Sequence, residues 1–190
     1  TGMNALAEEL GAIIAYPGQP ASSNASKCWN WFNPDDQARD KGEPALIAGL
    51  TRAILRDHPV DPARVYVAGL SAGGAAAAIV AQAYPDLFAA AGVHSGLPVG
   101  AATDVASAFA AMRNGAKGRR GTAAVPTIIF HGDADSTVHP SNGAALAHQS
   151  LSGFAKATAE VTTGTAAGGR SYRRTSHLHA DGRSICEHWQ

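Results

Sequence analysis

The sequence has few aromatic side chains and no excess of either charge. Phe, Trp and Tyr make up only 6% of its 190 residues although 45% are hydrophobic, so small side chains such as alanine must fill much of the core. The 15 basic and 15 acidic residues give a formal net charge of zero. A neutral chain argues against nucleic acid or an anionic membrane surface as the main partner.

Long apolar segments are also missing. No run approaches the roughly 18 apolar residues of a transmembrane helix, and no basic-then-apolar signal segment opens the sequence. The two cysteines, Cys28 and Cys186, leave the redox compartment open, because they can form one disulfide or pair with cysteines outside this chain. No Cys, His and Asp group has the spacing of a zinc site, so we expect no metal. Four acids are expected to be solvated turn and helix-start charges: Asp35, Asp36, Asp40 and Glu43.

What is present is an alternation of predicted strands and helices over a length suited to one domain, residues 1–190. Helices are predicted over 1–10, 43–57, 73–84 and 141–151, the second with Leu46, Leu50, Ile54 and Leu55 on one side. Strands are predicted over 12–16, 64–68, 89–94, 126–131 and 184–189, and a weaker polar hairpin or edge strand over 158–175. This order implies an α/β fold whose mostly parallel sheet is covered by helices on both faces.

The most informative motif is a strand that runs into Gly69-Leu70-Ser71-Ala72-Gly73 and then into an alanine-rich helix. This pattern is the nucleophile elbow of α/β-hydrolases. Glycines flank Ser71 because a side chain at either place would strike the neighbouring strand or helix. The elbow exposes the Ser71 hydroxyl, and the Ala72 N–H can face a developing oxyanion. The alternative is a glycine-rich turn whose serine only caps the helix.

A nucleophilic serine needs a base and an acid that orients the base. In this fold the order along the chain is serine, acid, histidine, and the acid follows a later strand. Residues 131–138 fit because strand 126–131 leads into them, but Asp133 and Asp135 compete there. We favour Asp135, since Val138 three residues later can tuck into the core and aim the carboxylate. The alternative is that both acids only shape the turn.

Taken together, the motifs resemble those of the polyhydroxybutyrate-depolymerase-type esterases, which share the α/β-hydrolase fold with feruloyl and acetylxylan esterases. The matching stretches are 28–32, 65–74, 84–88, 92–96, 131–140 and 187–189, and they span nearly the whole chain. The resemblance implies a secreted or exported, extracellular bacterial serine esterase without a cofactor, acting on hydroxyalkanoate polyesters or oligomers or on aromatic acyl esters. It carries over Ser71 as nucleophile, Asp135 as acid and the Ala72 N–H as one oxyanion donor.

Two parts of the family pattern lie outside the sequence. The family has a strand with a His-Gly-Cys-type oxyanion loop before the first helix, and its catalytic histidine stands in a Gly-His-x-Trp stretch after the Glu-His-Trp strand. The resemblance therefore implies an internal segment of a longer enzyme, incomplete at both ends. It also implies that Cys28 pairs with the cysteine of the oxyanion loop, while Cys186 has no assigned role.

None of the eight histidines within the sequence suits the role of base. His94 and His131 lie at strand ends and precede Asp135, and His139 in the acid loop is expected to cap the following helix. The others end a helix, lie on a helix surface, stand in a polar segment or lie inside the last strand: His58, His148, His177, His179 and His188. We therefore expect all eight to be structural or solvated.

Three aromatic residues, Trp29, Trp31 and Phe32, stand in an otherwise polar loop, which is costly unless they are buried or used. They either plug the top of the sheet or form a hydrophobic wall for an acyl group or a polymer surface. If the loop is extended, the period of two puts Trp29 and Trp31 on one side, where Trp189 can join them. The sequence leaves both possibilities open.

The sequence thus favours a serine carboxylic-ester hydrolase that works through an acyl-enzyme on Ser71. Two alternatives remain. One is a serine peptidase or acyltransferase, because the site and not the fold sets the substrate. The other is a hydrolase-fold binding domain that lacks the base.

Overall fold

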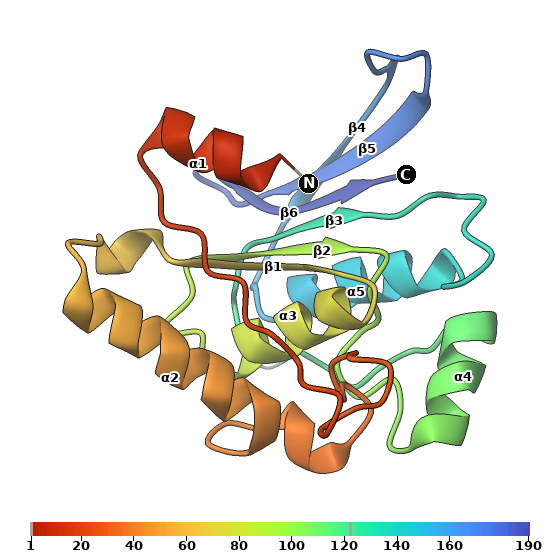
Figure 1. The fold of residues 1–190 in the computed structure, drawn as a ribbon. Coiled ribbons are helices and arrows are strands. Elements are labelled where there is room, and N and C mark those ends of the chain that lie inside the picture. The colour runs from red at the N-terminus through yellow and green to blue at the C-terminus, as the bar shows by residue number, and fades with distance from the viewer. Residues whose placement is uncertain (1, 122) are drawn as a thin grey trace.

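The computed structural model describes residues 2–121 and 123–190 (Figure 1). This part of the chain forms α-helices and β-strands, with two short 3-10 helices among them. They are α1 (Met3–Leu10), η1 (Pro34–Gln37), α2 (Gly42–Asp57), η2 (Pro62–Arg64), β1 (Tyr66–Leu70), α3 (Ala72–Ala83), β2 (Ala90–His94), α4 (Val105–Asn114), β3 (Thr127–Phe130), α5 (Ser141–Leu151), β4 (Thr158–Thr165), β5 (Ser171–Leu178) and β6 (Ser184–Trp189).

The strands form one sheet in the order β1-β2-β3-β6-β5-β4. The first four of these are mutually parallel, whereas β5 is antiparallel to both of its neighbours, β6 and β4. The mostly parallel sheet is therefore confirmed, and β4 and β5 form the hairpin predicted over 158–175. Because β1, β2 and β3 run in the same direction, their carboxyl ends meet at one edge of the sheet, where ligands bind in open α/β folds.

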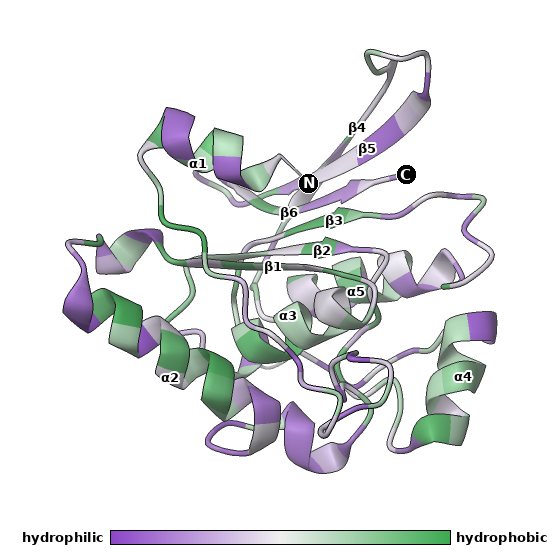
Figure 2. Cartoon of the chain, viewed as in Figure 1, coloured by the Kyte–Doolittle hydropathy of each residue, from purple (hydrophilic) through white to green (hydrophobic). Residues whose placement is uncertain are grey.

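Helices α3 and α5 pack on the parallel strands, and α2 packs against α3. Figure 1 shows these helices on one side of the sheet and α1 on the other. Most of α3 is buried, including the run from Gly74 to Ala81. Its small side chains let the helix axis approach the sheet closely, which explains how a chain poor in aromatics fills its core. Figure 2 shows β3 as mainly hydrophobic and β5 as largely hydrophilic.

The predicted strand over 12–16 is wrong. This segment is irregular, and Ile13 and Tyr16 are 53% and 61% exposed. Among the described residues β1 pairs only with β2, so the segment has no neighbouring strand with which to exchange hydrogen bonds. An apolar β-branched run is a strand only where a partner exists, because strand preference depends on context.

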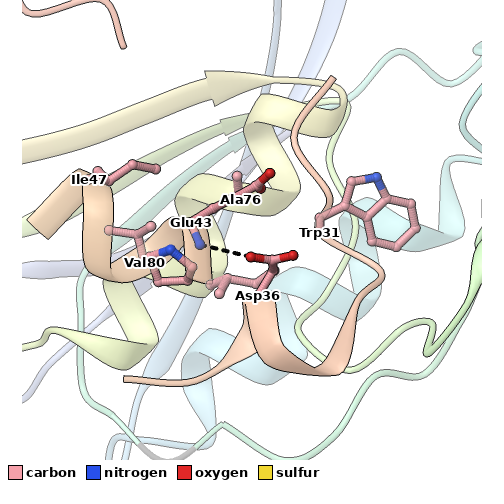
Figure 3. Close-up of a pocket in the computed structure, with 8 residues that line it drawn as sticks. Trp31, Asp36, Glu43, Ile47, Ala76 and Val80 are labelled. Atoms are coloured by element: carbon pink, nitrogen blue, oxygen red, sulfur yellow. Dashed lines mark hydrogen bonds between the residues drawn. The ribbon is translucent and has the colours of Figure 1, made fainter. Parts of the chain in front are cut away.

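Helix α2 is present as predicted, but its predicted apolar side faces the core only in part, since Ile54 and Leu55 are half-buried. Leu46 and Leu50 are 72% and 40% exposed, and the residues that face α3 are Pro44, Ile47 and Ala48. Figure 3 shows this contact, where a pocket between α2 and α3 is filled by the side chains that line it. None of the helices in the described part of the chain has both the length and the apolar character needed to cross a membrane.

Candidate active site

The elbow lies where β1 ends and α3 begins. Ser71 has φ 55° and ψ −120°, a conformation that is strained for a residue with a side chain. Its N–H donates to the carbonyl of His94 on β2 at 2.9 Å, and its carbonyl accepts from the N–H of Ala75 at 3.0 Å. The Ser71 side chain makes no capping hydrogen bond, so the alternative of a plain helix cap does not apply.

Close backbone contacts explain the glycines around the elbow. A Cβ on Gly69 would lie 2.0 Å from the carbonyl oxygen of Gly73, and one on Gly74 would lie 3.0 Å from that of His94. At Gly73 the nearest atom is Trp29 Cδ1 at 3.8 Å, an ordinary contact. The expected steric need for glycine is therefore present at Gly69 but not at Gly73, and within α3 it falls on Gly74 instead.

Ala72 is the first residue of α3, and it is half-buried. The N–H groups of a first helical turn have no partner within the helix, and the helix dipole makes that end electropositive. The Ala72 N–H is thus available beside Ser71 for an oxygen that gains negative charge.

Asp135 is held firmly in the loop after β3. Its Oδ1 accepts hydrogen bonds from the N–H groups of Thr137 and Val138, both at 2.9 Å. Val138 is 1% exposed and belongs to the central core, so it does tuck inward as the sequence suggested. Asp133 is exposed in the same loop.

The surroundings of Asp135 favour its charged form. Burial acts to raise the pKa of Asp135, but hydrogen bonds from the Val138 and Thr137 amides and the Ser95 hydroxyl, together with His131, outweigh it and lower the pKa below its ordinary value. A carboxylate that stays ionised is what an orienting acid requires.

Ser95 is a site residue that sequence reasoning missed. It follows β2, is buried and has φ 49°, and its N–H donates to the carbonyl of Phe130 at 2.9 Å. Its hydroxyl helps to lower the pKa of Asp135. The available signal was its position, since a serine directly after the strand between the elbow strand and the acid strand must end at the same sheet edge.

Ser71 and Asp135 therefore share one edge of the sheet. Ser71 follows β1 and Asp135 lies in the loop after β3, with Ser95 at the end of β2 between them. Adjacent strands are about 4.8 Å apart, so the ends of β1 and β3 are about 10 Å apart. A single imidazole can bridge a serine hydroxyl and a carboxylate at the ends of two such strands.

The described contacts of the eight histidines do not include the Ser71 hydroxyl. His58 caps the end of α2, His148 is exposed on α5, and His139 accepts from the Ser141 N–H at the start of α5. The ring of His94 stacks with Phe130 on the sheet. Three more lie in or beside the C-terminal strands β5 and β6, and one follows β3: His177, His179, His188 and His131. Across residues 2–121 and 123–190 no hydrogen bond joins a histidine to the Ser71 hydroxyl.

The three tryptophans separate. Trp29 is half-buried and lies against the first turn of α3 beside Ser71. Trp31 is 6% exposed and belongs to the core, as Figure 3 shows beside Ala76. Its role is to plug the sheet, one of the two possibilities that the sequence left open. Trp189 does not join Trp29: its ring packs at 5.9 Å from that of Phe130 and 5.0 Å from that of Tyr172.

Glu43 corrects the expectation of a solvated helix-start charge. It is 8% exposed. Its carboxylate accepts hydrogen bonds from the side chain of Gln19 at 2.6 Å, the side chain of Asn30 at 2.7 Å and the N–H of Asn30 at 2.7 Å. This buried carboxylate ties the segment that carries Trp29 to α2. Its burial has no local signal in the sequence, because the donors lie 13 and 24 residues away.

Neither cysteine is in a disulfide, so the possibility of a Cys28–Cys186 bridge is excluded. Burial raises the pKa of the Cys186 thiol to about 12, which leaves it unreactive. Cys28 is exposed, and its pairing with a cysteine outside this chain stays a prediction. In the described ranges no three His, Cys, Asp or Glu side chains gather in a way that could hold a metal ion.

Comparison with known proteins finds esterases among the relatives of this chain. Poly(3-hydroxyalkanoate) depolymerase C of Paucimonas lemoignei is 37% identical over 158 residues, which are 75% of this chain and 38% of that protein. Feruloyl esterase B of Thermothelomyces thermophilus is 30% identical over 97% of this chain and 68% of its own length. The chain thus spans little more than a third of the first relative and about two thirds of the second.

The fold is that of a solved esterase. The structure of acetyl xylan esterase from Aspergillus awamori superimposes with a TM-score of 0.75 and 22% identity, covering 98% of this chain and 74% of that one. The family described as esterase PHB depolymerase matches residues 1–170. With the elbow, the α/β-hydrolase sheet and a match over most of its length, the chain belongs to the esterase PHB depolymerase family.

Proposed function

We propose that this protein is a serine carboxylic-ester hydrolase and that Ser71 is its nucleophile. The observation that carries the proposal is the strained turn at Ser71. Its side chain makes no capping hydrogen bond to α3, although it lies next to the first N–H of that helix. Strain of this kind persists where function requires it. Membership of a family of esterases supports the same reaction class.

In the proposed mechanism Ser71 Oγ attacks the ester carbonyl carbon while its proton passes to a histidine base. The carbonyl oxygen becomes an oxyanion and accepts a hydrogen bond from the Ala72 N–H. The intermediate collapses, the C–O bond breaks, and the imidazolium returns the proton to the departing alcohol. Water, activated by the same histidine, then hydrolyses the acyl-enzyme and restores Ser71. The reaction needs no cofactor.

Asp135 is the acid that orients this base and stabilises it when it is charged. Two fixed amide donors hold the carboxylate in one orientation. The surroundings of the eight histidines in residues 1–190 support a base from outside this range, supplied by the longer protein of which the chain would be a part.

We propose acyl esters of hydroxyalkanoates or aromatic acids as substrates. The support is the similarity to a poly(3-hydroxyalkanoate) depolymerase and a feruloyl esterase, together with the position of Trp29 beside the elbow. Its indole offers a flat apolar wall to an acyl group. Trp189 is a more remote candidate, because it lies on β6 and packs against Phe130 and Tyr172. Following the family resemblance, the enzyme would act outside the cell.

The test is hydrolysis of p-nitrophenyl acetate and butyrate by the protein produced from the complete gene. Ser71→Ala should lower kcat by several orders of magnitude, whereas Ser22→Ala, at an exposed site, should not. A fluorophosphonate should label Ser71 as an activated serine. Unchanged turnover in Ser71→Ala would overturn the assignment. Cleavage of peptides but not esters would indicate a peptidase, and polymer binding without hydrolysis would indicate a binding domain.

A further inference from the structure

His131 is a buried residue next to the acid loop that the proposed mechanism leaves without a role. It follows β3 directly and is 3% exposed. Its Nε2 lies 2.8 Å from the carbonyl oxygen of Val138. A carbonyl oxygen only accepts hydrogen bonds, so this contact requires the proton of the imidazole to be on Nε2.

The contact is one of two hydrogen bonds that hold the backbone of Val138. The Val138 N–H donates to Asp135 Oδ1 at 2.9 Å, and the Val138 carbonyl accepts from His131 Nε2 at 2.8 Å. Val138 is thus bonded at both polar groups of its backbone, to the acid on one side and to His131 on the other. His131 and Asp135 are therefore linked through one residue.

The imidazole does not itself bind the carboxylate. Nε2 of His131 lies 3.6 Å from Oδ2 of Asp135, which is too long for a hydrogen bond. Oδ1 accepts the two amides, so Oδ2 keeps capacity for a further donor, since a carboxylate oxygen accepts more than one hydrogen bond.

A second buried histidine backs the first. Nδ1 of His131 and Nε2 of His188 are both buried without a hydrogen-bond partner among the described residues. A Cβ on Gly143 of α5 would lie 3.0 Å from the former and 2.9 Å from the latter, so both nitrogens face one backbone position. Burial, His131 and His177 all lower the pKa of His188. Asp135 is the acidic group that faces His131. The hydrogen bonds that hold Asp135 come from the Thr137 and Val138 amides.

We propose that His131, with a proton on Nε2, is a positioning residue that holds the Asp135 carboxylate toward the catalytic base. The inference rests on the proposed role of Asp135 and adds to it the residue that sets its orientation. His131 binds the loop over residues 132–138 to the end of β3, and its ring lies beside Gly143.

The test compares three substitutions in the full-length enzyme. His131→Leu and His131→Asn lack a donor that reaches the Val138 carbonyl, whereas the side-chain amide of His131→Gln lies where Nε2 lies. We expect kcat to fall about 10- to 100-fold in the first two, because a misplaced group costs about that much, and KM to stay unchanged. His131→Gln should recover most of kcat. The matched control is His148→Leu, at an exposed position on α5.

The pH profile separates positioning from packing. A displaced carboxylate no longer stabilises the protonated base, so the base loses its proton at lower pH. The acid limb of kcat/KM should therefore move to lower pH in His131→Leu and His131→Asn, and stay in place in His131→Gln and His148→Leu. A loss of thermal stability alone would not move this limb.

Two results would overturn the proposal. One is an unchanged kcat and acid limb in whichever of His131→Leu and His131→Asn folds, while Ser71→Ala remains inactive. The other is a proton on Nδ1 of His131 in the wild-type protein, read from the ¹⁵N shifts of its imidazole by NMR. Failure of the proposed function is distinct, because it appears as hydrolysis that does not depend on Ser71.

Discussion

Asp133 and Asp135 lie two residues apart, yet the loop gives them different surroundings. Asp133 is exposed, whereas Asp135 is half-buried and receives two backbone N–H donors. Several converging donors lower a carboxyl pKa because they stabilise its charged form. At the scale of single residues, the choice between two acids is thus a choice between a solvated charge and a fixed one.

Asp135→Asn should lower kcat about 10⁴-fold, the size of loss known for the acid of a serine triad, and Asp133→Asn should leave kcat unchanged. The pKa of Asp135 lies below its ordinary value of 3.8, so the stability gained from its ionised form is present above that pH and lost as the pH falls below it. The measurement is esterase kinetics between pH 5 and 9, where Asp135 stays charged. Equal losses in both variants would contradict the assignment.

Single residues also show how far the sequence could predict the site. Ser71, Ala72 and Asp135 were predicted from signals that are local: a pentapeptide, a strand that leads into it, and an acid three residues before a valine. Ser95 and Glu43 were missed because their partners are remote. The Ser95 hydroxyl meets Asp135 only once two strands align, and the Glu43 carboxylate is buried by Gln19 and Asn30.

At the scale of elements, the elbow depends on how closely β1 and α3 approach each other. The carbonyl of Gly73 occupies the space in which a side chain on Gly69 would begin. Because the contact is backbone against backbone, no side chain can rotate away to relieve it.

Gly69→Ala should therefore disrupt the elbow, lowering both esterase activity and thermal stability. Its control is Gly49→Ala on α2, where no atom lies within 4 Å of the added Cβ. There the change should be neutral or stabilise by up to about 1 kcal/mol, the gain in helix propensity. Thermal denaturation and hydrolysis of p-nitrophenyl butyrate would be measured for both variants. If Gly69→Ala behaved like Gly49→Ala, the steric account of the turn would be wrong.

The strands that sequence reasoning got right are those that have a partner strand. The strands that became β1, β2, β3 and β6 pair with one another, and α3 and α5 pack on them. Residues 12–16 have the same apolar character but no partner strand. The exposed leucines of α2 fail for a similar reason, because periodicity marks an apolar side without saying which side meets the core.

At the scale of the whole molecule, the two edges of the sheet differ. Within the described residues β1 has a free outer edge, and Tyr66 and Leu70 on it are each 62% exposed. The opposite edge, β4, is rich in threonine and carries Glu160. An apolar free edge offers unpaired N–H and C=O groups to another chain, whereas polar and charged residues discourage such pairing.

The chain of residues 1–190 should therefore self-associate as its concentration rises, through β1 rather than β4. Tyr66→Lys should shift sedimentation toward the monomer, because it places a charge on the free edge. Val161→Lys, at a 51% exposed site on β4, should have little effect. Analytical ultracentrifugation of the two variants at matched concentrations would decide the matter, and equal effects would contradict a role for β1.

The buried carboxylate of Glu43 has a consequence for redesign. Its hydrogen bonds make Gln19 and Asn30 part of the scaffold, although both lie in an irregular polar loop, where substitutions are usually tolerated. Because Trp29 is the proposed wall for the acyl group, libraries that test this proposal should vary Trp29 and leave these three residues unchanged. In such a library the side chain at position 29 changes, while the hydrogen bonds of Glu43 keep the loop in place.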